Sequence, residues 1–209
     1  MTKQEVDEIV NQYKGEMITD RDWFYESTQY DDRSAVINYS FIRHFKPTCV
    51  LEFGTRTGRC TTDIFNALIK NKKFFTFKPY EIDYGLRLAT QANVKTVLGL
   101  DMLVGGDVTQ DPELPNNIDY LFVDNCHDLA TTEWVFETLL KNCVPGAIVQ
   151  IHDVPLREDF YKGKTGLFPE TDFIIKLHKE GRLPLEKMYW ANEENPDIES
   201  TWWRYKPCA

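Results

Sequence analysis

Residues 49–62 read CVLEFGTRTGRCTT, and this stretch decides the fold. The mostly apolar run 50–53 is typical of a buried strand, and apolar residues return at helical spacing over 64–69. Between the two runs stand Gly54 and Gly58, where the absence of a Cβ atom permits left-handed backbone angles and the close approach of a ligand. The order strand, turn, helix predicts a turn whose N–H groups face a ligand at the positive end of a helix dipole.

The two glycines are also compatible with a tight strand-to-helix connection that binds nothing. Thr62 or Asp63 is the expected N-cap of the helix that follows. The spacing argues against a nicotinamide dinucleotide, because the fingerprint G-x-G-x-x-G needs a second glycine where this chain has Arg56.

Composition limits the class of protein and of partner. The chain has 209 residues, of which 42% are hydrophobic, enough for one globular core. Its formal charge of −9 and pI near 5.0 argue against nucleic acid as a partner, because that binding needs a basic surface. Small molecules are therefore the expected substrates, and the sequence predicts no oligomeric state.

The sequence shows neither a membrane span nor a signal peptide. No apolar run approaches the roughly 18 residues of a span, and the opening MTKQEVDEIVNQYKGE lacks an apolar core. Five cysteines without paired C-x-x-C spacing are expected to be reduced thiols. We therefore expect a cytoplasmic protein with no membrane partner.

Strand and helix patterns alternate along most of the chain. We expect helices within 1–46, at 84–97 and at 131–141, strands at 50–53, 74–77, 102–106, 118–124 and 147–153, and a terminal hairpin of 187–191 and 201–206. This alternation predicts an α/β fold with a doubly wound, mostly parallel sheet. Trp202 and Trp203 alternate along the last strand, so only one of them is expected to face the interior.

The sequence EFGTRTG at 52–58 resembles motif I of the class I S-adenosylmethionine (SAM)-dependent methyltransferases, in the variant E-x-G-[ST]-x-x-G of small-molecule O-methyltransferases. The resemblance covers roughly residues 35–153. It implies a Rossmann-like sheet of seven strands whose seventh strand is antiparallel, and the hairpin expected at the end of the chain agrees with that.

The same resemblance implies one methyltransferase domain over residues 1–209. We expect an N-terminal helical segment at 1–46, a cofactor-binding core at 47–153, and a final part at 154–209 with a lid loop, a helix and the hairpin. The loop at 155–169 carries several positive charges, which suit either a lid over an anionic substrate or a solvated surface.

Carried over to this chain, the resemblance implies that SAM contacts the glycine turn and acidic residues after the later strands. Glu81 is expected to bind the ribose hydroxyls, although Asp83 competes for that role and Pro79 could end the strand early. Asp107 is expected near the adenine, with Asp101 as its competitor. The full expected set is Glu52, Gly54, Thr55, Arg56, Gly58, Thr61, Glu81, Asp107 and Asp124.

Two aspartates follow two neighbouring strands. Asp124 ends the strand at 118–124, and Asp153 ends the strand at 147–153. Because adjacent strands lie about 4.8 Å apart, the two carboxylates can converge on one cation. Hard oxygen ligands suit Mg²⁺, or Mn²⁺ at similar sites.

The segments Asp124 to His127 and His152-Asp153 resemble D-G-D-H and H-D of metal-dependent sugar and antibiotic O-methyltransferases. The resemblance implies metal binding by Asp124, Asn125 and Asp153, with His127 as the base. Strand alternation places His152 on the opposite face from Asp153. Taken singly, each aspartate is as well explained by a helix cap, and His127 by a surface position.

These features predict a SAM-dependent methyltransferase that acts on a hydroxyl of a small polar metabolite such as a saccharide, assisted by Mg²⁺ or Mn²⁺. One alternative keeps the fold and cofactor without the metal, as an N- or O-methyltransferase. Another is a non-catalytic ligand-binding domain with the same fold.

Overall fold

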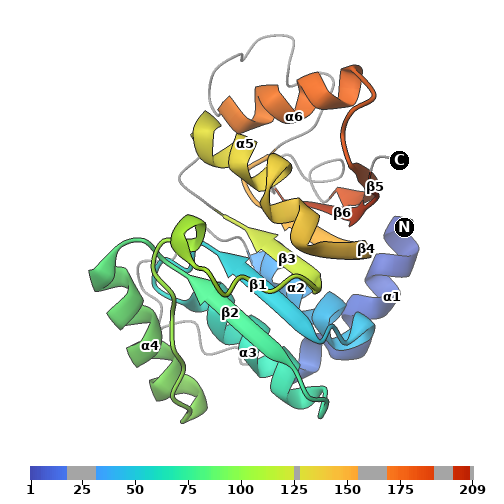
Figure 1. Cartoon of the computed structure of the whole chain (residues 1–209). Coiled ribbons are helices and arrows are strands. Elements are labelled where there is room, and N and C mark those ends of the chain that lie inside the picture. The colour runs from blue at the N-terminus through green and yellow to red at the C-terminus, as the bar shows by residue number, and fades with distance from the viewer. Residues whose placement is uncertain (18–31, 125–127, 155–168, 191–199, 208–209) are drawn as a thin grey trace. The chain divides into compact units, whose positions relative to one another are not determined.

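The computed structural model describes residues 1–17, 32–124, 128–154, 169–190 and 200–207. The chain divides into two compact units, Met1–Leu114 and Pro115–Ala209, each with its own strands and helices (Figure 1). The single domain expected from the sequence stays a prediction. Among the helices of the described ranges, none is long and apolar enough to span a membrane.

The first unit contains two parallel strands and most of the helices. Its elements are α1 (Lys3–Tyr13), η1 (Lys14–Glu16), α2 (Asp32–Phe45), β1 (Cys49–Phe53), α3 (Arg59–Lys70), β2 (Thr76–Tyr80), α4 (Tyr84–Leu98) and η3 (Val108–Gln110). Strands β1 and β2 run parallel, with Cys49 opposite Thr76. The helices expected at the N-terminus and at 84–97 are confirmed.

Helix α3 begins earlier than expected. Its N-cap is Gly58, with φ 87°, and neither Thr62 nor Asp63 caps it. The hydroxyl of Thr62 instead donates to the carbonyl oxygen of Gly58 at 2.7 Å, which is a bond within the first turn of the helix. The glycine turn and the start of the helix are therefore continuous, so the turn lies directly at the helix N-terminus.

Pro79 does not end β2, because the N–H that a proline lacks is not needed there. It lies opposite Glu52 within the β1–β2 pair, and its carbonyl accepts a bond from Gly105 N–H at 2.8 Å. The N and C=O of one strand residue point to the same side, so the missing N–H would have faced away from β1. The pairing of β1 with β2 therefore loses no hydrogen bond.

The strand expected at 102–106 is not found. The segment makes one bridge, between Gly105 and Tyr80, and Glu81 N–H donates to Gly105 C=O at 3.0 Å. Leu103 is 88% exposed whereas Val104 is 8% exposed, so the face of the segment that carries Leu103 is open. The described residues therefore hold six strands, and the expected seventh is not confirmed.

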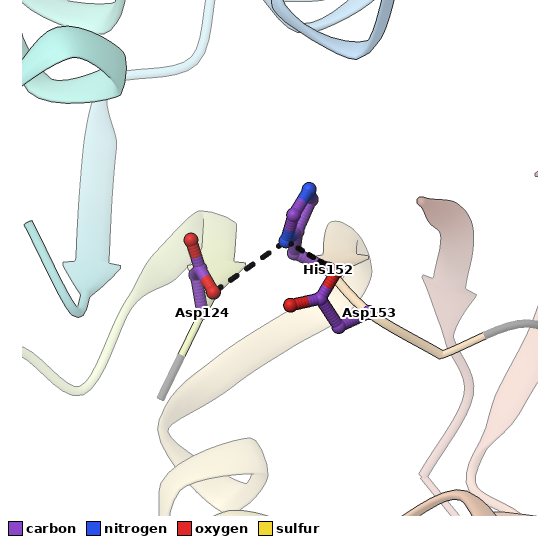
Figure 2. Close-up of side chains that lie close together, drawn as sticks. All are labelled: Asp124, His152 and Asp153. Carbon is purple, nitrogen blue, oxygen red and sulfur yellow. Dashed lines mark ion pairs between the residues drawn. The ribbon is translucent and has the colours of Figure 1, made fainter. Parts of the chain in front are cut away.

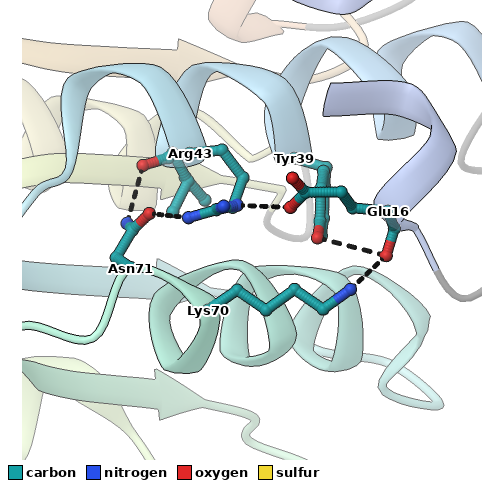
Figure 3. Close-up of polar contacts among 6 residues, drawn as sticks. Glu16, Tyr39, Arg43, Lys70 and Asn71 are labelled. Atoms are coloured by element: carbon teal, nitrogen blue, oxygen red, sulfur yellow. Dashed lines mark hydrogen bonds and ion pairs between the residues drawn. The ribbon is translucent and has the colours of Figure 1, made fainter. Parts of the chain in front are cut away.

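A polar network joins η1 to helices α2 and α3 (Figure 3). Arg43 lies between two partners, with its Nε 2.9 Å from Glu16 Oε2 and its Nη1 donating to Asn71 Oδ1. Tyr39 OH and Lys70 Nζ both donate to the carbonyl oxygen of Glu16. One short segment is thus held by bonds to two helices.

The second unit contains four strands. Its elements are β3 (Ile118–Val123), α5 (Leu129–Glu137), η4 (Leu139–Asn142), β4 (Cys143–Ile151), α6 (Pro169–Lys179), β5 (Leu185–Trp190) and β6 (Thr201–Tyr205). The strands lie in the order β3-β4-β6-β5. Strands β3 and β4 are parallel, whereas β6 is antiparallel to both β4 and β5. The antiparallel hairpin expected at the end of the chain is confirmed.

Both tryptophans of β6 are buried, and the prediction that only one faces the interior is wrong. Trp202 is 0% exposed and Trp203 is 2% exposed. Thr201 and Tyr205, on the same face of β6 as Trp203, are also buried, so both faces of the strand are covered. Alternation predicts which face a side chain is on, but not whether the second face is open.

Candidate functional site

The glycine turn follows β1 in the first unit and has the backbone that its sequence predicts. Gly54 and Gly58 have φ of 92° and 87°, and Arg56 between them has φ 49°. Gly54 N–H donates to Tyr80 C=O at 3.0 Å, and Gly58 N–H donates to Thr55 C=O at 2.8 Å. The turn is thus tied both to the end of β2 and to itself.

Glu81 lies beside this turn. Its Oε2 accepts the backbone N–H of Arg56 at 2.8 Å, and its Oε1 accepts the N–H of Asp83 at 3.2 Å. Each carboxylate oxygen keeps a further lone pair for a ligand hydroxyl. Asp83, the competing candidate, caps α4 instead, since its Oδ1 accepts the N–H of Leu86 at 2.9 Å.

Helix α4 braces the turn from one side, which the sequence did not suggest. Thr90 Oγ1 donates to Arg56 C=O at 2.9 Å, and Asn93 Nδ2 donates to Thr57 C=O at 2.8 Å. In a trans peptide the C=O and the next N–H point in opposite directions. The bond from Thr90 therefore directs the N–H of Thr57 away from α4. The sequence feature that could have indicated these contacts is the pair Thr90 and Asn93, which are three residues apart and therefore lie on one face of the helix.

The other expected cofactor residues lie in several kinds of place. Glu52 at the end of β1 and Thr61 in α3 are both 0% exposed. The hydroxyl of Thr55 lies 3.0 Å from that of Thr90, so it faces α4. Asp107 is exposed and caps η3. The structure thus brings Gly54, Arg56, Gly58 and Glu81 together, and leaves Asp107 in its own turn.

Asp101, the competitor of Asp107, is bound to α4. Its Oδ1 lies 2.8 Å from Lys95 Nζ, and both side chains are largely exposed. This surface pair contributes little to stability. It gives Asp101 a role that needs no ligand.

The second unit brings two aspartates and a histidine together at the ends of β3 and β4 (Figure 2). The backbone N–H of His152 donates to Val123 C=O at 2.9 Å, so the parallel pairing extends to this point. His152 Nδ1 lies 3.5 Å from Asp124 Oδ1 and 3.1 Å from Asp153 Oδ1. The convergence of Asp124 and Asp153 expected from strand spacing is therefore present.

His152 is not on the opposite face from Asp153, and that expectation is wrong. Strand β4 ends at Ile151, and Asp153 has φ 56°. This left-handed residue breaks the alternation and turns its carboxylate to the side of the imidazole. No glycine marks this left-handed turn in the sequence, because the short polar side chain of an aspartate is compatible with such an angle.

The two carboxylates control the charge of His152. Burial alone lowers its pKa, but the hydrogen bonds and negative charges of Asp124 and Asp153 outweigh burial and raise the pKa to about 10. The imidazole is 3% exposed, whereas the side chains of Asp124 and Asp153 are 31% and 24% exposed. His152 is therefore the buried member of the cluster, and the two carboxylates are its solvent-accessible members.

The three side chains are suited to hold a metal ion. One ligand atom from each of Asp124, His152 and Asp153 lies within 4.8 Å of the others. Two further expected site residues, Asn125 and His127, lie outside the described residues. Asp124 and Asp153, the described residues of the expected metal site, therefore lie close to each other and to His152.

About half of the chain matches a known protein family. Residues 51–154 match the methyltransferase domain family. No curated protein sequence shows significant similarity to the chain.

Several solved structures share the fold over nearly the whole chain. An O-methyltransferase from Bacillus cereus, in complex with S-adenosylhomocysteine (SAH), has a TM-score of 0.65 at 12% identity, covering 99% of this chain and 92% of that one. The O-methyltransferase TomG from Streptomyces achromogenes, in complex with SAM, has a TM-score of 0.61 at 14% identity, with the same coverages.

A third match has a similar TM-score. The SAH-bound methyltransferase PaMTH1 from Podospora anserina has a TM-score of 0.64 at 17% identity, covering 99% of this chain and 98% of that chain. At such identities the likeness shows the fold, which is α/β and Rossmann-like with antiparallel C-terminal strands. The chain therefore belongs to the methyltransferase domain family and has the fold of class I SAM-dependent O-methyltransferases.

Proposed function

We propose that the chain transfers the methyl group of SAM to a hydroxyl oxygen of a small polar metabolite, with a divalent cation held by Asp124 and Asp153. The main support for SAM binding is the position of Glu81. Its carboxylate is held beside the left-handed glycine turn by a hydrogen bond from the N–H of Arg56. Solved relatives of the same fold contain SAM or SAH.

The glycine turn fits an adenosyl amino acid. It combines a helix N-terminus with a carboxylate held close by, which suits a ligand that has a carboxylate at one end and ribose hydroxyls further along. When bound, SAM supplies an electrophilic methyl group on a sulfonium ion. Glu81 would accept bonds from the ribose hydroxyls, and the N–H groups at the start of α3 would face the carboxylate.

The aspartate pair fits a cation that acts on the acceptor hydroxyl. A divalent ion held by Asp124 and Asp153 would lower the pKa of a hydroxyl placed against it. His127 would accept the proton at a ring nitrogen before the oxygen attacks the methyl group. Oxygen transfer and a sugar-like acceptor are favoured by the resemblance of the two aspartate segments to sugar O-methyltransferases, and by the O-methyltransferases among the structural relatives.

Methyl transfer from SAM with an isotopic label tests this proposal directly. Acceptor panels of sugars, sugar phosphates, catechols and amines would be compared by formation of SAH, with and without a chelator. We expect transfer to hydroxyl acceptors that stops with the chelator and returns with Mg²⁺ or Mn²⁺. Asp153→Asn should remove the cation dependence together with the activity, whereas Asp172→Asn on the exposed face of α6 should behave as wild type.

A metal-free methyltransferase is the second candidate, and His152 is the observation that favours it. A protonated imidazole between Asp124 and Asp153 balances one of the two negative charges without a cation. Transfer that is unchanged by the chelator, or that goes only to amines, would select this candidate and contradict the metal-assisted one.

A further inference from the structure

We infer that Nδ1 of His152 is itself a ligand of the cation, so that Asp124, His152 and Asp153 form a mixed nitrogen and oxygen site that prefers a first-row transition metal ion to Mg²⁺. This inference rests on the proposed function, because that function supplies the cation. It differs from the all-oxygen site for Mg²⁺ or Mn²⁺ that the sequence predicts.

The two distances from Nδ1 of His152 to the carboxylates are those between ligands of one ion. Metal bonds to imidazole nitrogen and carboxylate oxygen are about 2.1 Å long, so two neighbouring ligand atoms lie about 3.0 Å apart in octahedral geometry and about 3.4 Å in tetrahedral geometry. The measured separations from Nδ1 of His152 are 3.1 Å to Asp153 and 3.5 Å to Asp124. An ion can therefore be bound without a change of the backbone.

The backbone keeps the imidazole in this place. The N–H of His152 is bonded to Val123 C=O, which fixes the residue against the end of β3. The left-handed angle of Asp153 brings the next carboxylate to the same side as Nδ1. Since the imidazole is 3% exposed, it is enclosed by protein on its other sides, and Nδ1 faces the two carboxylates (Figure 2).

The donor set determines which ion is preferred. Imidazole nitrogen suits Fe²⁺, Co²⁺, Ni²⁺ and Zn²⁺, whereas Mg²⁺ is bound by oxygen and keeps several waters. A bound ion would displace the proton from Nδ1 of His152 into solvent, and the two carboxylates with the neutral imidazole would then carry a charge of −2, which balances a divalent ion. The more exposed side of Asp124 and Asp153 leaves room for water or for a substrate hydroxyl.

Spectroscopy of the full-length, untagged protein tests this without any methyl transfer. After removal of metals with a chelator, Co²⁺ would be titrated by its visible absorption, and Mg²⁺ would be added in competition. Mn²⁺ would be added to a second sample, where electron spin-echo modulation detects a directly bound ¹⁴N. We expect one bound Co²⁺, an affinity about tenfold or more above that for Mg²⁺, and a clear ¹⁴N signal.

Three variants assign the nitrogen. In His152→Gln the amide oxygen can replace Nδ1, so the ¹⁴N signal should disappear and the preference for Co²⁺ should fall by about tenfold. His178→Gln, on the exposed side of α6, and His127→Gln should keep both. Circular dichroism would verify that each variant is folded.

The contradicting results are equally direct. Wild-type protein without a ¹⁴N signal, or with equal affinity for Co²⁺ and Mg²⁺, would overturn the inference even if His152→Gln fails to fold. A signal that survives in His152→Gln and is lost in His127→Gln would do the same.

Failure of the proposed function gives a different pattern. SAH binding and methyl transfer are measured separately, so a protein with the expected metal spectrum that transfers no methyl group would contradict only the proposed function. A protein that transfers methyl groups to hydroxyls and shows no nitrogen ligand would contradict only this inference.

Discussion

Position 58 needs a glycine for two separate reasons. Its φ of 87° is a left-handed angle, and a Cβ atom there would lie 2.7 Å from Thr90 Cγ2 and 2.9 Å from Thr90 Cα. The sequence predicted the first reason from the spacing of the turn. It could not predict the second, because the contact joins α3 to a helix thirty residues further along the chain. Gly58 thus serves helix packing as well as the binding turn.

Replacement of Gly58 by Ala should therefore destabilise the protein more than backbone strain alone explains. Gly146 is a matched control, because its φ is 85° and no atom lies within 4 Å of its Cβ position. We expect Gly146→Ala to cost about 1 kcal/mol and Gly58→Ala about 3 kcal/mol or more, in the free energy of unfolding by urea. SAH affinity should fall only in Gly58→Ala. Equal losses in the two variants would show that the contact with Thr90 is unimportant.

Tyr80 and Asp111 form a second residue-scale feature that the sequence did not suggest. The hydroxyl of Tyr80 donates to Asp111 Oδ2 at 2.6 Å. That bond is the main cause that lowers the pKa of Asp111, and burial together with the carboxylate raises the pKa of Tyr80, which stays neutral and able to donate. Because the pKa of Asp111 is lowered in the folded state, the bond stabilises the fold above the ordinary pKa of an aspartate. This contribution is lost as the pH falls through the lowered value.

Tyr80→Phe should accordingly raise the pKa of Asp111 towards its usual range, as measured by NMR titration of the carboxyl carbon. The variant should be less stable than wild type at pH 7, and the difference should shrink in acid. Tyr84→Phe, at an exposed neighbouring position, should change neither quantity. A pKa of Asp111 that is unchanged in Tyr80→Phe would contradict this account.

Among the helices and strands, α4 makes the most contacts with the glycine turn that could not be predicted from the sequence. The pattern predicted a helix at 84–97, and the structure places it at Tyr84–Leu98. Its contacts with the glycine turn, through Thr90 and Asn93, need the folded arrangement to be seen. The strand expected at 102–106 failed for a related reason, since local apolar content does not show whether a partner strand is available.

The brace from α4 predicts a specific loss of cofactor affinity in Thr90→Val. This variant keeps the side-chain shape and removes the hydroxyl that orients the Arg56–Thr57 peptide, so SAH affinity should fall by about tenfold. Turnover at saturating SAM should stay close to wild type, and Thr90→Ser should restore the affinity. Thr96→Val is the control, because that hydroxyl donates to Ala92 C=O within α4. Equal SAH affinity in Thr90→Val and Thr96→Val would contradict a role of the brace in binding.

For the whole molecule, sequence reasoning reached the fold class, the glycine turn and the two strand-end aspartates. Each depends on short-range pattern, such as glycine spacing or a carboxylate after an apolar strand. The position of His152 depended on one left-handed residue, Asp153, and the burial of both Trp202 and Trp203 depended on what covers the two faces of β6. Those covering segments are distant in the sequence, and local pattern does not identify them.

The single-domain prediction can be tested by calorimetry. If residues 1–209 form one domain, heat unfolding should show one cooperative transition whose calorimetric and van't Hoff enthalpies agree. SAH should raise its midpoint as the ligand concentration increases, because the ligand binds the folded state. Two separate transitions, with only one shifted by SAH, would show that the units divided at Leu114 and Pro115 unfold independently.

The central claim is that the turn around Gly54 and Gly58, with Glu81 beside it, binds the adenosyl cofactor. Calorimetric titration of SAM into the protein of residues 1–209 tests it most directly, with Glu81→Gln as the variant and Glu133→Gln, at an exposed position of α5, as its control. We predict saturable binding at one site, weakened about tenfold or more in Glu81→Gln and unchanged in Glu133→Gln. No measurable binding, or equal affinity in all three proteins, would contradict the claim.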